Sequence, residues 1–247
     1  MVGTNSHNYS GTFDGQNHTL KLNWDSGSNG YIAPFCIVEG ATIRNLRTEG
    51  NIKSSYSHLS GLILTVFGKT TITNCVSDVN ITSSKKSGSC AIAGMALSIK
   101  YGAVVTFTDC IVKGKFHATT ENGRRGISGF VRDQYGSCTL TNCLYAGENN
   151  SSSGYTFCTN SFSGTTITNC YYLNACGVAQ GTKITEEQLK SGEVTKKLQN
   201  NRTDKCYWAQ QLGKMPDFYN AADKSKANYG YYDAAKKGWA CDDFRLT

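Results

Sequence analysis

The chain repeats one short motif, Thr-Thr-Ile-Thr-Asn-Cys, which stands at residues 70–75 and again at 165–170. Related segments stand at 42–46, 106–110 and 139–143. Across the five copies, the shared Asn or Asp recurs every 27 to 35 residues. Such a period is typical of a repeat protein in which each copy forms one coil of a solenoid.

The spacing within each copy predicts a turn of the chain. An apolar residue stands two positions before the Asn or Asp, and Leu or Cys follows it directly. Residues three apart cannot share one face of a straight strand, so the chain must bend between them. Asn and Asp suit a bend because they tolerate left-handed backbone, and their side chains can stack as a ladder. The expected corner residues are Asn45, Asn74, Asp109, Asn142 and Asn169.

The cysteines of the motif occupy one repeated position, where the first copy carries Leu46. That exchange indicates an apolar environment, so we expect a stack of reduced, buried thiols, with disulfides or redox chemistry as the alternative. The 11 cysteines form no Cys-x-x-Cys pair, and the four histidines lack the spacing of zinc ligands. We therefore expect no metal site and no cofactor.

Further apolar strands precede the corner at 61–66, 94–99 and 129–132, with no helix between strands. This pattern predicts an all-β fold, a right-handed parallel β-helix of about five to six coils over residues 1–180. Residues 181–247 are expected to form a small helical or irregular cap packed on the last coil. Thr185 and Gln188 have the spacing of a capping box at its first helix.

Composition excludes some classes of function. The net charge of +7 is spread along the chain rather than gathered in a basic stripe, so we expect no nucleic-acid partner. The apolar runs are far shorter than the ~20 residues that span a membrane. No signal-peptide pattern follows Met1, so we expect a segment taken from a larger extracellular protein whose signal is absent or removed.

The sequence resembles bacterial extracellular proteins with GLUG-type repeats and related right-handed β-helices. The resemblance rests on FDGQNHTL at 13–20, on Gly-Leu strands before the Thr-Ile-Thr-Asn-Cys corner, and on ITEEQLKSGEV and WAQQLGKMP at 184–194 and 208–216. It covers most of residues 9–216. It implies a secreted or cell-surface location. These repeats occur in adhesin-like proteins, some large secreted peptidases and proteins with carbohydrate-active domains, and they bring no catalytic motif.

Segments of variable length are expected at one edge of the coils, at 54–58, 83–89, 119–126 and 148–154. Loops on one edge of a solenoid commonly form its binding face. The basic residues on this edge are Lys85, Lys86, Arg124 and Arg125. They could bind an acidic glycan, or they could simply be solvated loop residues.

A column of aromatic residues precedes the corner strands. Tyr101 and Tyr135 occupy it, with Phe67 and Phe162 at related places. Such rings could stack on sugars or on one another, and the two tyrosines are our ligand-binding candidates.

In the neighbouring coils we expect Leu64 and Val66, or Leu97 and Ile99, to point inward. The pair Arg132-Asp133 interrupts this apolar alternation in its own strand. If the protein is an enzyme, its speculative catalytic residues are Arg132, Asp133, Lys100 and Tyr135. A shifted register that turns both charges outward explains the interruption equally well.

The function expected from these observations is non-catalytic binding by a secreted or surface-displayed bacterial module. Its partner would be a glycan or a host surface. The alternatives are a polysaccharide lyase or hydrolase acting along the β-helix, and a structural spacer within a larger surface protein.

Overall fold

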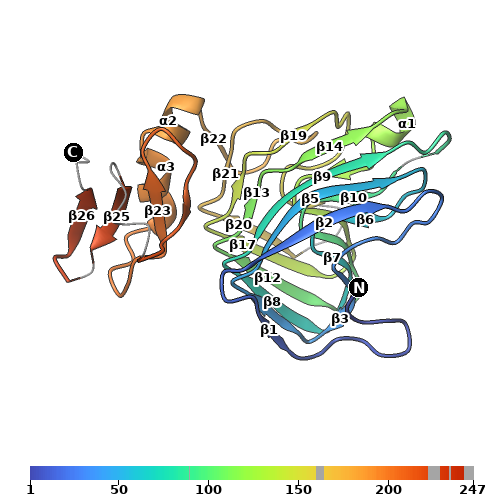
Figure 1. The fold of residues 1–247 in the computed structure, drawn as a ribbon, viewed down its shortest axis with the longest axis horizontal. Coiled ribbons are helices and arrows are strands. Elements are labelled where there is room, and N and C mark those ends of the chain that lie inside the picture. Colours follow the sequence, from blue (N-terminus) through green and yellow to red (C-terminus); the bar gives the residue numbers. More distant parts are fainter. Residues whose placement is uncertain (89, 160–163, 222–228, 234, 242–247) are drawn as a thin grey trace.

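A computed structural model describes residues 1–88, 90–159, 164–221, 229–233 and 235–241. It shows an all-β parallel β-solenoid of about five turns with three short helices, which confirms the predicted fold class. Strands of successive coils lie side by side and pair in parallel, and the C-terminal residues form a separate group of elements beside the coils (Figure 1).

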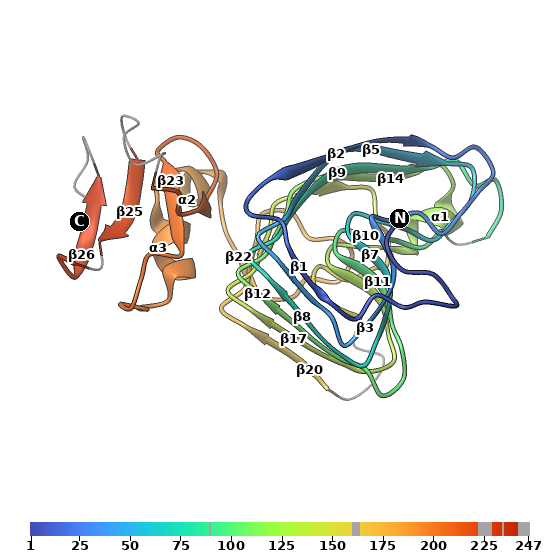
Figure 2. The same ribbon diagram turned by 60° about the horizontal axis from the view of Figure 1, so that its bottom comes forward.

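Two long parallel sheets form the main walls of the solenoid (Figure 2). Sheet I ends at the corner residues and contains β1 (Thr12–Asp14), β4 (Thr42–Arg44), β8 (Lys69–Thr73), β12 (Val104–Thr108), β17 (Ser137–Thr141) and β20 (Thr165–Thr168). Sheet II follows the corner and contains β2 (Thr19–Asp25), β5 (Arg47–Ser54), β9 (Val76–Ser83), β13 (Ile111–Val112), β14 (Lys115–Ala118), β18 (Leu144–Tyr145), β19 (Glu148–Asn149), β21 (Tyr171–Tyr172) and β22 (Thr182–Lys183).

Two smaller sheets close the remaining side of each coil. Sheet III contains β6 (Leu59–Ser60), β10 (Ile92–Ala93) and β15 (Ile127–Ser128), and sheet IV contains β3 (Phe35–Glu39), β7 (Ile63–Phe67), β11 (Ala96–Ile99) and β16 (Val131–Gln134). The expected strands before the corner are therefore present as β7, β11 and β16. From sheet IV the chain passes to sheet I and starts the next coil.

The five predicted corner residues all have left-handed backbone, with φ between 51° and 56°. Their side chains also form the expected ladder, although it is interrupted at Asp109. Asn74 Nδ2 donates to Asn45 Oδ1 over 2.8 Å, and Asn169 Nδ2 donates to Asn142 Oδ1 over the same distance. Four of the five corners thus supply both the turn and a side-chain hydrogen bond to a neighbouring corner.

The cysteines that follow the corners are buried in the main core. Cys75, Cys110 and Cys143 are fully enclosed, and Leu46 occupies the equivalent place in the coil before Cys75. All described cysteines whose side chains are placed are free thiols. Burial raises the pKa of the Cys75 and Cys143 thiols well above the ordinary value, so both stay protonated and chemically inert.

The C-terminal cap combines helices with a small sheet. It contains α2 (Glu186–Lys190), α3 (Glu193–Gln199) and the antiparallel strands β23 (Trp208–Gln211), β24 (Asp217–Phe218), β25 (Tyr229–Asp233) and β26 (Gly238–Cys241). The predicted capping box is present, since Thr185 Oγ1 accepts from the Gln188 backbone N–H and Gln188 Oε1 accepts from Thr185 N–H. The antiparallel sheet was not foreseen.

The cap packs against an apolar stripe on the outside of sheet II. In four coils, the residue after the corner cysteine points outward, and these residues are Val76, Ile111, Leu144 and Tyr171. They form one cluster with cap side chains such as Leu198 and Trp208. The ion pair between Arg47 on β5 and Asp217 extends the contact to the coil that contains the Asn45 corner. The cap therefore spans the coils laterally, further than the expected contact with the last coil alone.

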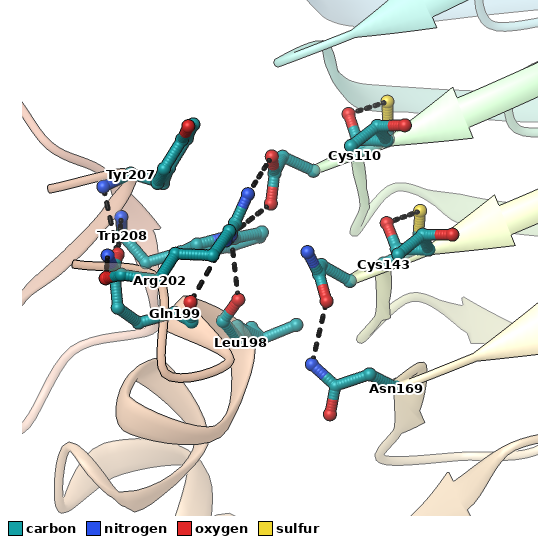
Figure 3. A network of polar contacts seen from close by, with 12 residues as sticks. Cys110, Cys143, Asn169, Leu198, Gln199, Arg202, Tyr207 and Trp208 are labelled. Carbon is teal, nitrogen blue, oxygen red and sulfur yellow. Dashed lines mark hydrogen bonds and ion pairs between the residues drawn. The ribbon is translucent and has the colours of Figure 1, made fainter. Parts of the chain in front are cut away.

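Asp109 connects the cap to the solenoid through its charge (Figure 3). Arg202 donates to both of its carboxylate oxygens over 2.8 Å, and Trp208 Nε1 donates to Oδ1 over 2.7 Å. The Asp109 side chain is 4% exposed. Because a bidentate pair in a dry environment has strict geometry, this acidic corner constrains where the cap docks.

Replacing Asn142 by Ala should lower the free energy of unfolding by about 1–3 kcal/mol, because Ala disfavours the left-handed backbone and ends the bond to Asn169. Asn142→Gly still allows the left-handed backbone and loses only the side-chain hydrogen bond to Asn169, so it should lower the free energy of unfolding by less. Urea denaturation of both variants checks this, and equal losses would contradict the conformational role of the corner.

Asp109→Asn should weaken docking of the cap by about 1–3 kcal/mol, since it removes the charge that Arg202 binds. Asp14→Asn is the matched control, because Asp14 stands on the same ladder and its partner Arg44 is half-exposed. Limited proteolysis should release the cap in the first variant only. The same sensitivity in both variants would argue against the anchor.

Candidate functional site

The outer face of sheet IV brings together the four residues of the speculative catalytic set. Ser98 pairs with Asp133 and Ile99 with Gln134, so β11 and β16 are neighbours in register. Lys100 and Tyr135 directly follow these pairs and also lie side by side, with Tyr135 N–H donating to Ile99 O. Arg132 and Asp133 stand a few residues earlier on β16.

Arg132 and Asp133 form an ion pair with each other, and both side chains are about one quarter exposed. Neither side chain points into the main core. The inward position of their strand is taken by Gln134, where the neighbouring strands have Val66 and Ile99. The amide of Gln134 is buried and satisfied by Gly136 O and Thr165 Oγ1.

The register also corrects the expected direction of Leu64 and Leu97. Both were expected to point into the main core. They instead pack with Ala33, Ala91 and Ala93 in a second cluster. The inward residues are Ile63 and Val66 in β7, and Ala96 and Ile99 in β11, so they are three positions apart rather than two. Leu64 and Leu97 therefore turn outward toward sheet III. Arg132 follows them in the next coil.

A groove of about 580 Å³ lies across this outer face. Ile37 and Leu64 lie at its floor and are almost completely buried. Tyr31, Phe67 and Lys100 bring two aromatic rings and one ammonium group. A concave site of this size, mostly apolar with a few polar groups, has the general character of a small-ligand site.

Tyr31 is held in place beside the groove by a neighbouring ring. It stacks on His58 with ring centroids 4.6 Å apart and planes at 14°, and Tyr56 lies 6.5 Å from it. Lys85 lies over the Tyr56 ring at 5.5 Å. Tyr31 itself has left-handed backbone and is 56% exposed. These contacts join the first coil to the loop edge.

The variable loops do share one edge of the solenoid. Ser54 pairs with Ser83, and Ser83 pairs with Ala118, so the segments after β5, β9 and β14 leave the same end of sheet II. Helix α1 (Glu121–Arg124) lies in the third loop. Of the four basic residues expected here, Lys86, Arg124 and Arg125 are exposed and Lys85 is half-buried.

The aromatic column lies at the turn between sheets IV and I. Tyr101 is 90% exposed and Tyr135 is 45% exposed, while Phe67 is half-buried and lines the groove. Phe162 lies outside the described residues. The column thus borders the groove at Phe67, and the Tyr101 ring stands out into solvent.

Sequence reasoning missed Tyr31, Asn5 and Asn8 as groove residues. All three belong to the segment before and within the first coil, so no repeat pattern marks them. A usable signal was the Asn-Gly at 29–30 before Tyr31, which predicts a turn. Gly30 is required there, because a Cβ atom would meet the Tyr56 ring at 2.2 Å.

No group of three or more His, Cys, Asp or Glu residues suited to a metal ion occurs in the described part of the chain. Within the same ranges, no helix has the length and apolar character of a membrane span.

Comparison with known proteins gives a likeness in fold. No protein-family profile and no curated protein sequence matches the chain. A crystal structure from Bacteroides ovatus, named as a "putative immunoglobulin A1 protease", is similar with a TM-score of 0.53, covering 83% of this chain and 76% of that one. The two sequences are 14% identical, so the likeness shows the solenoid fold alone.

Burial lowers the pKa of His58 below its ordinary value of 6.5; Asp133 opposes this shift, and Lys85 and Arg132 add to it. The folded state therefore favours neutral His58. As the pH falls below about 6.5, the unfolded chain takes up a proton first, so stability should decrease toward the lowered pKa of the folded state.

An NMR titration of His58 should show this lowered pKa, and Asp133→Asn should lower it further. The His58→Gln variant should lose less stability than the unmodified chain between about pH 7 and pH 5. A pKa that Asp133→Asn leaves unchanged would contradict the electrostatic contact between the loop and β16.

Proposed function

We propose that this chain is a non-catalytic binding module that recognises a glycan through the groove on sheet IV. The observation that carries the proposal is that the accessible rings of Tyr31 and Phe67 line one groove with the polar groups of Asn8 and Lys100. A pyranose has apolar faces and hydroxyl edges, so apolar surface beside polar groups is complementary to it.

Tyr31 is the expected anchor. Its ring has more than half of its surface available for burial and is already ordered by the stack on His58. A ring that is fixed before binding loses little conformational freedom when a sugar covers it. Its contribution to affinity should therefore be larger than that of Tyr101, which is 90% exposed.

The ion pair of Arg132 and Asp133 favours binding over catalysis. Each charge is engaged by the other, and the pair is half-buried. A carboxylate acting as base or nucleophile must reach the reacting atom, which here would require Arg132 to release it. The pair is more readily explained as a structural ion pair on β16, at the edge of sheet IV.

The setting of this module is part of the same proposal. We infer an adhesin-like segment of a larger bacterial protein, secreted or displayed at the cell surface. Support comes from the resemblance to GLUG-type repeat proteins and from the fold shared with the Bacteroides ovatus structure. A lateral cap that protects one side of the coils while leaving sheet IV open is consistent with such a role.

A glycan array probed with the purified chain tests the proposal. We expect retention of a defined set of glycans, and Tyr31→Ala should weaken it about tenfold, equivalent to about 1.4 kcal/mol. Tyr101→Ala is the matched control and should bind normally. Binding lost only in Tyr101→Ala would move the site to the aromatic column. Release of new reducing ends from a glycan would favour an enzyme. Binding to no glycan on the array would refute glycan binding.

A further inference from the structure

We propose that the groove selects glycans that carry an acidic sugar, and that Lys100 is the residue that binds the acidic group. The inference rests on the proposed function and concerns the ligand class of the same site.

The position of Lys100 places its charge at the groove. Lys100 directly follows β11, and its backbone N–H donates to Val66 O over 3.0 Å. Since Ile99 pairs with Val66, Lys100 stands beside Phe67 on the neighbouring strand. Both side chains line the groove and both are half-buried. A sugar lying over the Phe67 ring would therefore have the ammonium group at its edge.

The other charges on this face are already engaged. Arg132 is paired with Asp133, and Glu39 Oε2 accepts from Asn8 Nδ2 over 2.9 Å. Among the described residues, Lys100 takes part in no ion pair. Glu39 stands two strands away from Lys100, roughly 10 Å at the usual strand spacing. The groove thus presents one cationic group that forms no ion pair among the described residues, while the nearer carboxylate, Asp133, is paired with Arg132.

A half-buried ammonium group discriminates between neutral and acidic ligands. Partial removal from water weakens its hydration, and a neutral hydroxyl replaces that hydration only in part. A carboxylate or sulfate gives a charge-assisted hydrogen bond, which is about twice as strong as a neutral one. Lysine acts as a point charge and does not impose the geometry of either anion, so both are tested below.

Two matched ligand pairs provide the test: oligogalacturonate with its methyl ester, and a sulfated chondroitin oligosaccharide with its desulfated, carboxyl-esterified form. Affinities would be measured by calorimetry at low salt and at about 0.15 M salt. We expect at least one acidic form to bind about tenfold more tightly than its neutral counterpart, with a preference that shrinks as salt increases.

Lys100→Gln should abolish the preference for the acidic form, while Lys53→Gln should retain it because Lys53 is exposed on β5 in sheet II. The thermal unfolding of both variants is measured first, to show that each is folded. A preference that persists in Lys100→Gln, or is lost equally in Lys53→Gln, would overturn the inference.

The outcomes separate this inference from the proposed function. If neutral glycans bind as tightly as acidic ones and Tyr31→Ala weakens both, the glycan-binding function stands and the acidic preference is refuted. If neither these probes nor any glycan on the array is retained, the proposed function fails, and the ligand class fails with it.

Discussion

The left-handed corner at the five Asn and Asp residues is the constraint on which the rest of the structure depends. A single residue with positive φ reverses the direction of alternation, so its two neighbours face opposite regions of the molecule. The next residue, Cys or Leu, enters the core. The one after it faces outward, and in four coils it is apolar and contacts the cap. One backbone conformation thus organises the ladder, the core and the cap interface.

Asp109 shows how a single substitution within a repeat acquires a separate role. Asn at a corner can donate to one neighbour and accept from another, which continues the ladder. The Asp109 side chain has no donor, but its carboxylate accepts hydrogen bonds from Arg202 and Trp208. The repeat is locally interrupted, and the cap gains a specific anchor. Two similar side chains with the same backbone preference therefore serve different interactions because only one is ionised.

Local rules predicted the features that depend on chain periodicity. The corner at Asn142, the buried Cys143 and the capping box at Thr185 each follow from residue type and spacing within a few positions. The groove does not, because Tyr31 belongs to a segment without a repeat. Leu64 was assigned to the wrong face because strict alternation ignores the offset of three in β7. Contacts between distant segments, such as Asp109 with Arg202, depend on the folded arrangement.

The lateral position of the cap affects how the solenoid would unfold. In a linear array each coil contacts only its neighbours, so terminal coils can fray independently. Here the cap contacts the coil of Asn45 through Arg47, a middle coil through Asp109 and the last Asn corner at Asn169. Coils that are distant along the solenoid axis are thereby coupled through a shared partner. The solenoid should accordingly unfold in a more cooperative transition than its repeat architecture alone implies, because the cap links coils along the solenoid axis.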